Sequence, residues 1–134
     1  MEIFIEFYGE KLKVDNILKG SAIKRYSSVW QKGEPEYAGS GKINKQSGVQ
    51  VRVCDKETVR EQIKEVRKFI EKYRNEIIKL RSLKGIDAAE IRFGLNWYEG
   101  KDVMKTSFFP NDFLLLCGKL KIDLKLCEYL TSDN

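Results

Sequence analysis

One stretch of the sequence, residues 55–83, limits what this chain of 134 residues can fold into. Apolar side chains recur there at steps of four and three residues, at Val59, Ile63, Val66, Ile70, Tyr73, Ile77 and Leu80. This spacing lines one face of an α-helix. Thr58 stands three residues before Glu61, which is a capping-box pattern for a helix start. The stretch therefore predicts a long amphipathic helix, and its length predicts a break near Asn75.

The other face of this helix carries charges in a regular order. Acids precede bases by three residues, in the pairs Glu57–Arg60, Glu61–Lys64, Glu65–Lys68, Glu71–Arg74 and Glu76–Lys79. Each such pair on an exposed helix adds only about 0.2–0.5 kcal/mol. Their repetition predicts a solvated face rather than a surface for nucleic acid.

Alternating apolar and polar residues elsewhere predict strands. The expected strands are 2–8, 22–30, 49–54, 89–97 and 122–127. Shorter helices are expected from Asp15, as a capping residue, to Gly20, and from Pro110, as the first helical residue, to Gly118. The order β-α-β-β-α-β-α-β predicts one α+β domain over residues 1–134. Its single sheet of about five strands would be mainly antiparallel, with the helices packed on one face.

Two segments stand outside this pattern. Residues 31–47 are rich in Gly, Lys and polar side chains, and they predict a long mobile loop or a loosely paired hairpin. Residues 131–134 are expected to be a frayed tail.

Both faces of the first strand carry aromatic residues, so this strand is expected in the interior of the sheet.

The three cysteines, Cys54, Cys117 and Cys127, form no C-x-x-C pair and lie in apolar runs. This usage predicts buried, reduced thiols. Met1 leads directly into a strand pattern without a basic segment, and no apolar run approaches the roughly 20 residues of a membrane span. We therefore expect a cytoplasmic protein without a membrane partner.

The chain contains no histidine. Its absence removes Ser-His-Asp and Cys-His nucleophile systems and histidine-based metal sites. Two pairs of carboxylates, Glu34 with Glu36 and Glu99 with Asp102, lie in expected loops beside lysines, where nothing indicates burial or a raised pKa. The sequence thus predicts no catalytic residues, no metal ligands and no cofactor, and we expect a protein that is not an enzyme.

Positive charge is concentrated in one part of the chain. The net charge is +5, and residues 11–52 hold nine Lys or Arg against three acids. Aromatic side chains alternate with basic ones in this part. The candidate partner-binding residues are Arg25, Tyr26, Trp30, Lys32 and Tyr37. Such a combination suits packing within a sheet, an interface with a protein, where Trp, Tyr and Arg dominate the binding energy, or single-stranded nucleic acid.

Four segments form a further pattern: the helix end at 18–20, the Trp-x-Lys-Gly segment at 30–33, the helix at 59–70, and the short apolar helix and closing strand from Phe113 to Tyr129. Together they resemble a family of small bacterial domains of unknown function, and the resemblance spans most of the chain. The order at 118–120 departs from the family's pattern, and 39–47 has no counterpart in it. The resemblance implies a fold and brings no catalytic residues.

By size and class the chain is also similar to bacterial immunity proteins, which bind and block toxins. This resemblance implies a non-enzymatic protein-binding module whose partner is a cognate toxin domain. The alternative is a nucleic-acid-binding module that uses the basic aromatic segment 24–45. Salt dependence separates the two, because phosphate contacts weaken steeply with salt.

Overall fold

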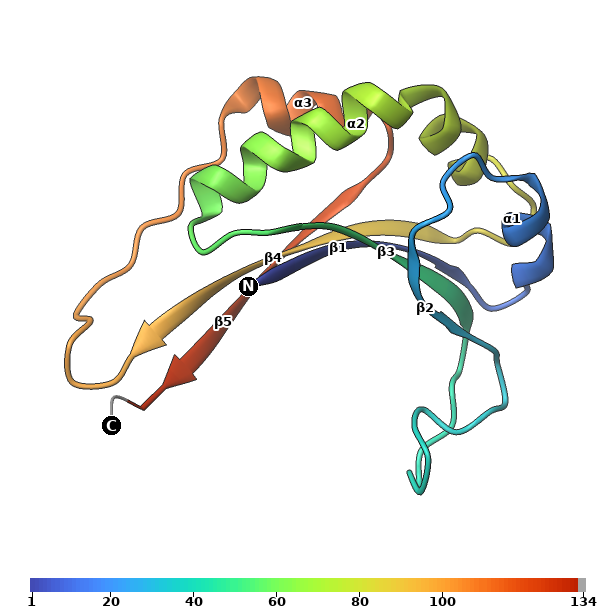
Figure 1. Cartoon of the computed structure of the whole chain (residues 1–134), viewed down its shortest axis with the longest axis horizontal. Helices are drawn as coiled ribbons and strands as arrows, with labels where there is room; N and C mark the ends of the chain where they lie inside the picture. The colour runs from blue at the N-terminus through green and yellow to red at the C-terminus, as the bar shows by residue number, and fades with distance from the viewer. Residues whose placement is uncertain (133–134) are drawn as a thin grey trace.

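The computed structural model describes residues 1–132. Its elements are β1 (Glu2–Gly9), α1 (Val14–Gly20), β2 (Tyr26–Trp30), β3 (Ser47–Asp55), α2 (Val59–Arg81), β4 (Ala88–Tyr98), α3 (Asn111–Lys119) and β5 (Asp123–Thr131). The sheet has the strand order β2-β3-β1-β4-β5 (Figure 1). The predicted α+β class and element order are confirmed, and β1 is the central strand, as its two aromatic faces predicted.

One neighbouring pair departs from the antiparallel pattern. β4 and β5 run parallel, from Glu90 opposite Asp123 to Tyr98 opposite Thr131. Parallel neighbours need a crossover connection rather than a hairpin. Residues 99–122 supply it, and they carry α3 back along the helix side of the sheet.

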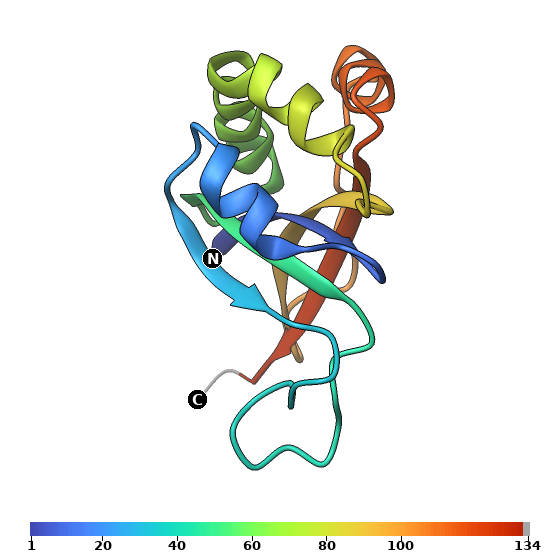
Figure 2. The ribbon, with the colours of Figure 1, turned by 90° about the vertical axis from the view of Figure 1, so that its right-hand side faces the viewer.

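The three helices cover the same face of the sheet (Figure 2). The central strand β1 has one apolar face, which the helices bury. Its residues Ile3, Ile5 and Phe7 are fully buried, while the side chains between them, on the other face, are partly exposed. On the uncovered face, charged side chains pair across the strands. Arg92 lies 3.5 Å from Glu6, and Lys125 lies 3.9 Å from Glu90.

Helix α2 lies across the sheet with its predicted apolar stripe inward. Ile63, Val66, Ile70, Ile77 and Leu80 are buried. The predicted cap is present, because the Thr58 hydroxyl accepts a hydrogen bond from the Glu61 N–H at 3.2 Å. The backbone leaves helical geometry at Tyr73, where φ is −113° and ψ is 21°, two residues before the predicted break at Asn75.

A buried glutamine joins α2 to the sheet. β1 pairs with β4 only as far as Arg92, so the backbone of Gly94 has no strand neighbour on that side. The Gln62 amide takes the place of that neighbour. Its Oε1 accepts from the Gly94 N–H at 3.1 Å, and its Nε2 donates to the Gly94 carbonyl at 2.8 Å and to that of Lys56 at 2.9 Å.

Several of the predicted ends of helices and strands were wrong. The strand expected over 22–30 begins only at Tyr26. Asp15 lies in the first turn of α1 and does not cap it, and Pro110 is the N-cap of α3 rather than its first residue. Thr131, expected in the tail, ends β5, while 133–134 lie outside the described residues.

The stability of this arrangement can be tested with two isoleucines on α2. Ile70 is fully buried, whereas Ile78 is 46% exposed on the same helix. Ile70→Ala should lower the free energy of unfolding by about 2–5 kcal/mol through lost burial and a residual cavity. Ile78→Ala should change it by less than about 1 kcal/mol. Urea denaturation gives both values, and equal losses would contradict the packing of α2 on the sheet.

The cysteines are free, as predicted, but they are not equally buried. Cys54 and Cys117 are buried, and burial raises the pKa of each thiol to about 11. Cys127, on edge strand β5, is only half-buried, which corrects the expectation that all three are hidden.

Thiol labelling should separate these three cysteines. The thiolate is the reactive form, so raised pKa values and burial both slow the reaction. With a disulfide reagent at pH 8, one thiol should react quickly and two only on unfolding. Cys127→Ser should remove the fast phase. Three equal rates in the native protein would contradict the described burial.

Candidate functional site

The first candidate surface is the free edge of the sheet at β2. This strand has β3 on one side and no strand on the other within residues 1–132. The segment 31–46, which we call the arm, follows it and projects on the side away from the helices (Figure 1). The arm is loosely paired, since the Gly33 N–H donates to the Asn44 carbonyl at 2.9 Å and Pro35 bridges to Ile43.

The five residues predicted to bind a partner follow this edge but do not share a pocket, and Lys32 is the one of them that lines a hollow, together with Glu10 and arm residues from 33 to 46. Arg25 and Lys32 are exposed, and Lys32 pairs with Glu10 at 3.1 Å. Tyr37 lies in the arm and is 69% exposed. The Tyr26 hydroxyl is buried, and burial raises its pKa, so this side chain belongs more to the core than to the surface.

Trp30 is held in place by the neighbouring strand. Its ring lies on Gly48 of β3, where a Cβ atom would stand only 2.3 Å from the Trp30 Cζ2. The glycine therefore provides the space for the indole, which remains partly exposed. A rigid, half-exposed aromatic ring loses little conformational entropy when a partner packs against it.

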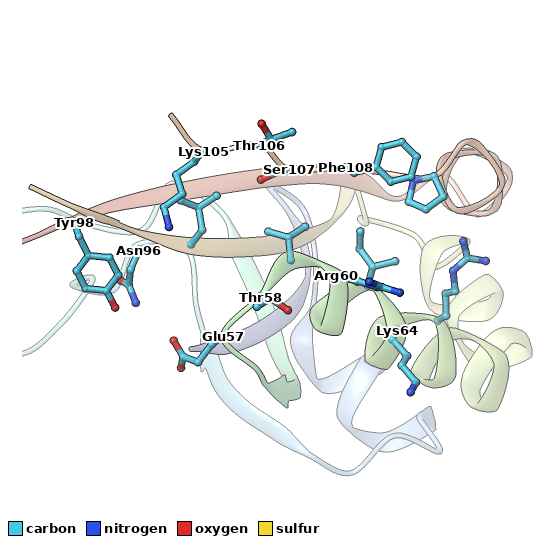
Figure 3. A pocket seen from close by; sticks show the side chains of 15 residues that line it. Glu57, Thr58, Arg60, Lys64, Asn96, Tyr98, Lys105, Thr106, Ser107 and Phe108 are labelled. Carbon is cyan, nitrogen blue, oxygen red and sulfur yellow. The ribbon is translucent and has the colours of Figure 1, made fainter. Parts of the chain in front are cut away.

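The second candidate site is a cleft that the sequence did not reveal. It lies between the first half of α2, the end of β4 and the segment that leads to α3, and its volume is about 890 Å³ (Figure 3). Ligand pockets commonly have volumes of about 300–1,000 Å³. Its apolar lining consists of Val59, Ile63, Leu95, Phe108 and Pro110.

The cleft has a positive lining. Arg60, Lys64 and Arg67 come from one side of α2, and Lys105 comes from the opposite wall. Glu57 is the one acid among the lining residues, and it accepts a hydrogen bond from the Met1 amine at 2.6 Å. Thr106 and Ser107 also line the cleft, on the segment that leads to α3.

Two of the four cations already have acidic neighbours. Arg67 donates to both carboxylate oxygens of Asp112, at 2.7 and 3.1 Å, and its guanidinium lies over the Phe113 ring. Lys105 lies 3.4 Å from Asp102 and over the ring of Tyr98. The Arg67–Asp112 contact joins α2 to α3 at one end of the cleft. The Lys105–Tyr98 contact joins the opposite wall to the end of β4 at the other end.

Arg60 and Lys64 were expected to pair with acids along their own helix. Of the five predicted pairs on α2, Glu65–Lys68 is the only one within 4.0 Å in the described chain. Both Arg60 and Lys64 instead line the cleft without an ion pair to any described residue. Arg60, Lys64 and Arg67 are spaced by four and three residues, which places them on the same side of a helix. The sequence could have shown this, but it did not show which part of the chain this side would face.

Comparison with known proteins assigns no role to either site. Comparisons with protein-family models, with curated proteins and with solved structures found no match. Across residues 1–132, no helix has the length and apolar character to cross a membrane. Within the same residues, no three His, Cys, Asp or Glu side chains are grouped as metal ligands.

The pair of Arg67 and Asp112 makes the cleft sensitive to acid. Hydrogen bonds from Arg67 lower the pKa of the Asp112 carboxyl, with help from the Phe113 N–H. A lowered pKa stabilises the fold above the ordinary carboxyl pKa of about 3.9, and this contribution is lost as the pH falls through the lowered value.

Arg67→Gln should therefore return the Asp112 pKa toward its ordinary value. The carbon chemical shift of the Asp112 carboxyl, followed by NMR from pH 6 to pH 2, reports it directly. The stability difference between wild type and variant should be larger at pH 6 than at the acid end, because the contribution of the ionised Asp112 carboxyl is lost there while the contact of Arg67 with the Phe113 ring is not. An unchanged Asp112 titration in the variant would contradict the described pair.

Proposed function

We propose that this chain is a non-enzymatic module that binds a protein partner along the β2 edge and the arm, in the manner of an immunity protein that blocks a toxin domain. The observation that carries the proposal is the unpaired outer edge of β2, beside a projecting arm that displays exposed apolar and basic side chains. An open strand edge can accept an extended segment of a partner through backbone hydrogen bonds.

The exposed side chains support a protein partner. Val29 on β2, and Tyr37 and Ile43 in the arm, are exposed although they are large and apolar. Side chains of this kind, together with the fixed ring of Trp30, are typical anchors of protein interfaces. They are less typical of a surface whose only purpose is solubility.

The charge of this edge favours an acidic partner, because residues 24–46 hold five Lys or Arg against the two acids Glu34 and Glu36. Lys24 precedes β2, and Lys42 and Lys45 lie in the arm, without ion pairs to described residues. Exposed lysines also protect strand edges from unwanted pairing. Long-range attraction would speed association with an acidic surface, whereas the aromatic anchors would contribute most of the affinity.

Alanine substitutions can distinguish anchors from charges once the partner has been isolated with tagged protein from a nuclease-treated lysate of the source cells. Tyr37→Ala and Trp30→Ala should each raise the Kd about 30-fold or more, which is the effect of a hot-spot residue. The double variant Lys42→Ala/Lys45→Ala should change it by only about threefold at 150 mM salt. Calorimetry with the purified partner measures both effects.

Tyr129→Ala is the matched control, since this tyrosine is about half-exposed on the opposite edge strand, β5. Its Kd should equal that of the wild type. Tyr37 lies in the arm outside the core, so its substitution tests binding even if Trp30→Ala weakens the fold. Capture that depends on nucleic acid and on Lys42 and Lys45 would favour the nucleic-acid module instead. Binding that no substitution in β2 or the arm affects would place the interface elsewhere.

A further inference from the structure

The cleft beside α2 has the features of a ligand site in its own right. Its buried floor consists of Val59, Ile63 and Leu95, which also belong to the main core. A bound molecule would therefore rest on a surface that the fold already holds rigid. Rigid, concave and mainly apolar walls with a few polar groups are typical of small-molecule sites.

Phe108 is the clearest sign of an unfilled contact. It lines the cleft, yet 76% of its surface is exposed, and the fold gives it little to pack against. A ligand that lay between this ring and α2 would remove apolar surface of the ring from water, which is favourable. The ligand therefore needs an apolar body, either aromatic or aliphatic.

The charges define the other half of the ligand. Arg67 and Lys105 are compensated by Asp112 and Asp102, whereas Arg60 and Lys64 have no acidic neighbour within 4.0 Å in the described chain. Figure 3 shows Arg60 on the first turns of α2, across from the wall that carries Thr106 and Ser107. A guanidinium and an ammonium group one helical turn apart on α2 suit a carboxylate or phosphate group.

The size of the cleft favours a compact molecule. The lining extends along α2 from Thr58 to Arg67, which is about 14 Å of helix. The Arg67–Asp112 and Lys105–Tyr98 contacts lie near its two ends. A ligand of small-molecule size fits between them, whereas a peptide that continued through the cleft would have to displace one of these contacts.

We propose that this cleft binds a small amphipathic anion, with its apolar body between Phe108 and the Val59–Ile63–Leu95 floor and its carboxylate or phosphate at Arg60 and Lys64. The site is separate from the β2 edge and from the partner proposed there. It uses residues of α2, β4 and the segment before α3 only.

A pair of fluorescent probes tests the two halves of this proposal. Anilinonaphthalene sulfonate carries an aromatic body and one negative charge, and N-phenyl-1-naphthylamine has the same body without the charge. The anionic probe should bind at least about tenfold more tightly, because only it can pair with the two cations. Amide chemical shifts should change at residues 57–67, 95–98 and 105–110.

Matched substitutions on one helix test the assignment of the charges. Arg60→Gln/Lys64→Gln should weaken binding of the anionic probe about tenfold and leave the neutral probe unchanged. Lys68→Gln/Lys72→Gln removes the same charge from α2 outside the cleft and should have no effect. Phe108→Ser should weaken both probes, and this exposed side chain can be changed without loss of the fold.

Three results would overturn the proposal. These are equal affinity for the two probes, an equal loss in both double variants, and chemical-shift changes confined to β5 or the arm. Octanoate and octyl phosphate distinguish the two head groups, because one carries a carboxylate and the other a phosphate. The ligand that binds more tightly identifies the head group. Trp30→Ala and Tyr37→Ala should leave probe binding unchanged, so failure of the proposed partner interface and failure of this site can be told apart.

Discussion

The packing of α2 on the sheet determines most of the fold. All three helices cover one face, and α2 alone crosses β3, β1 and β4. Each large apolar side chain that it buries contributes about 1.5–3 kcal/mol before the entropy cost is counted. This attraction is not directional, so it does not by itself determine how the helix lies along the strands.

Gln62 supplies that direction. Its amide pairs with both backbone groups of Gly94, beyond the point where β1 stops pairing with β4. A buried amide with its donor and acceptor satisfied tolerates little displacement, because an unpaired group costs about 1–3 kcal/mol. The first half of α2 is thereby fixed beside the end of β4. The cleft lies at this junction, so its α2 and β4 walls are held by the same contact.

The sequence predicted the parts of the fold that depend on local pattern. The stripe from Val59 to Leu80 and the Thr58 cap determine α2, because helical spacing and capping act within a few residues. The direction of β5 could not be predicted in this way. Alternation at Leu124 and Leu126 indicates a strand and its faces, but it does not encode which neighbour the strand joins or in which direction.

The same limit explains the candidate sites. Arg25, Lys32 and Tyr37 could be proposed as partner-binding residues from the sequence because composition alone marks a basic aromatic segment. The partial burial of Trp30 depends on Gly48, which is distant in sequence and adjacent in the sheet. Arg60 and Lys64 were assigned to local ion pairs, since their acidic neighbours on the helix are visible in the sequence. The wall that they face comes from residues 105–110, which reach α2 only because β5 runs parallel to β4.

The distribution of paired charges suggests why binding would occur at the edge and the cleft rather than on the broad open face of the sheet. On that face Arg92 pairs with Glu6 and Lys125 with Glu90, so neighbouring charges already neutralise each other. A partner would have to desolvate and separate such pairs, with little gain in Coulomb energy. In the arm only Lys32 has an acidic partner within the described residues, Glu10, whereas Lys42 and Lys45 have none. Arg60 and Lys64 likewise form no ion pair with a described residue. An acidic partner or ligand could therefore pair with these cations without first breaking an ion pair of the described fold.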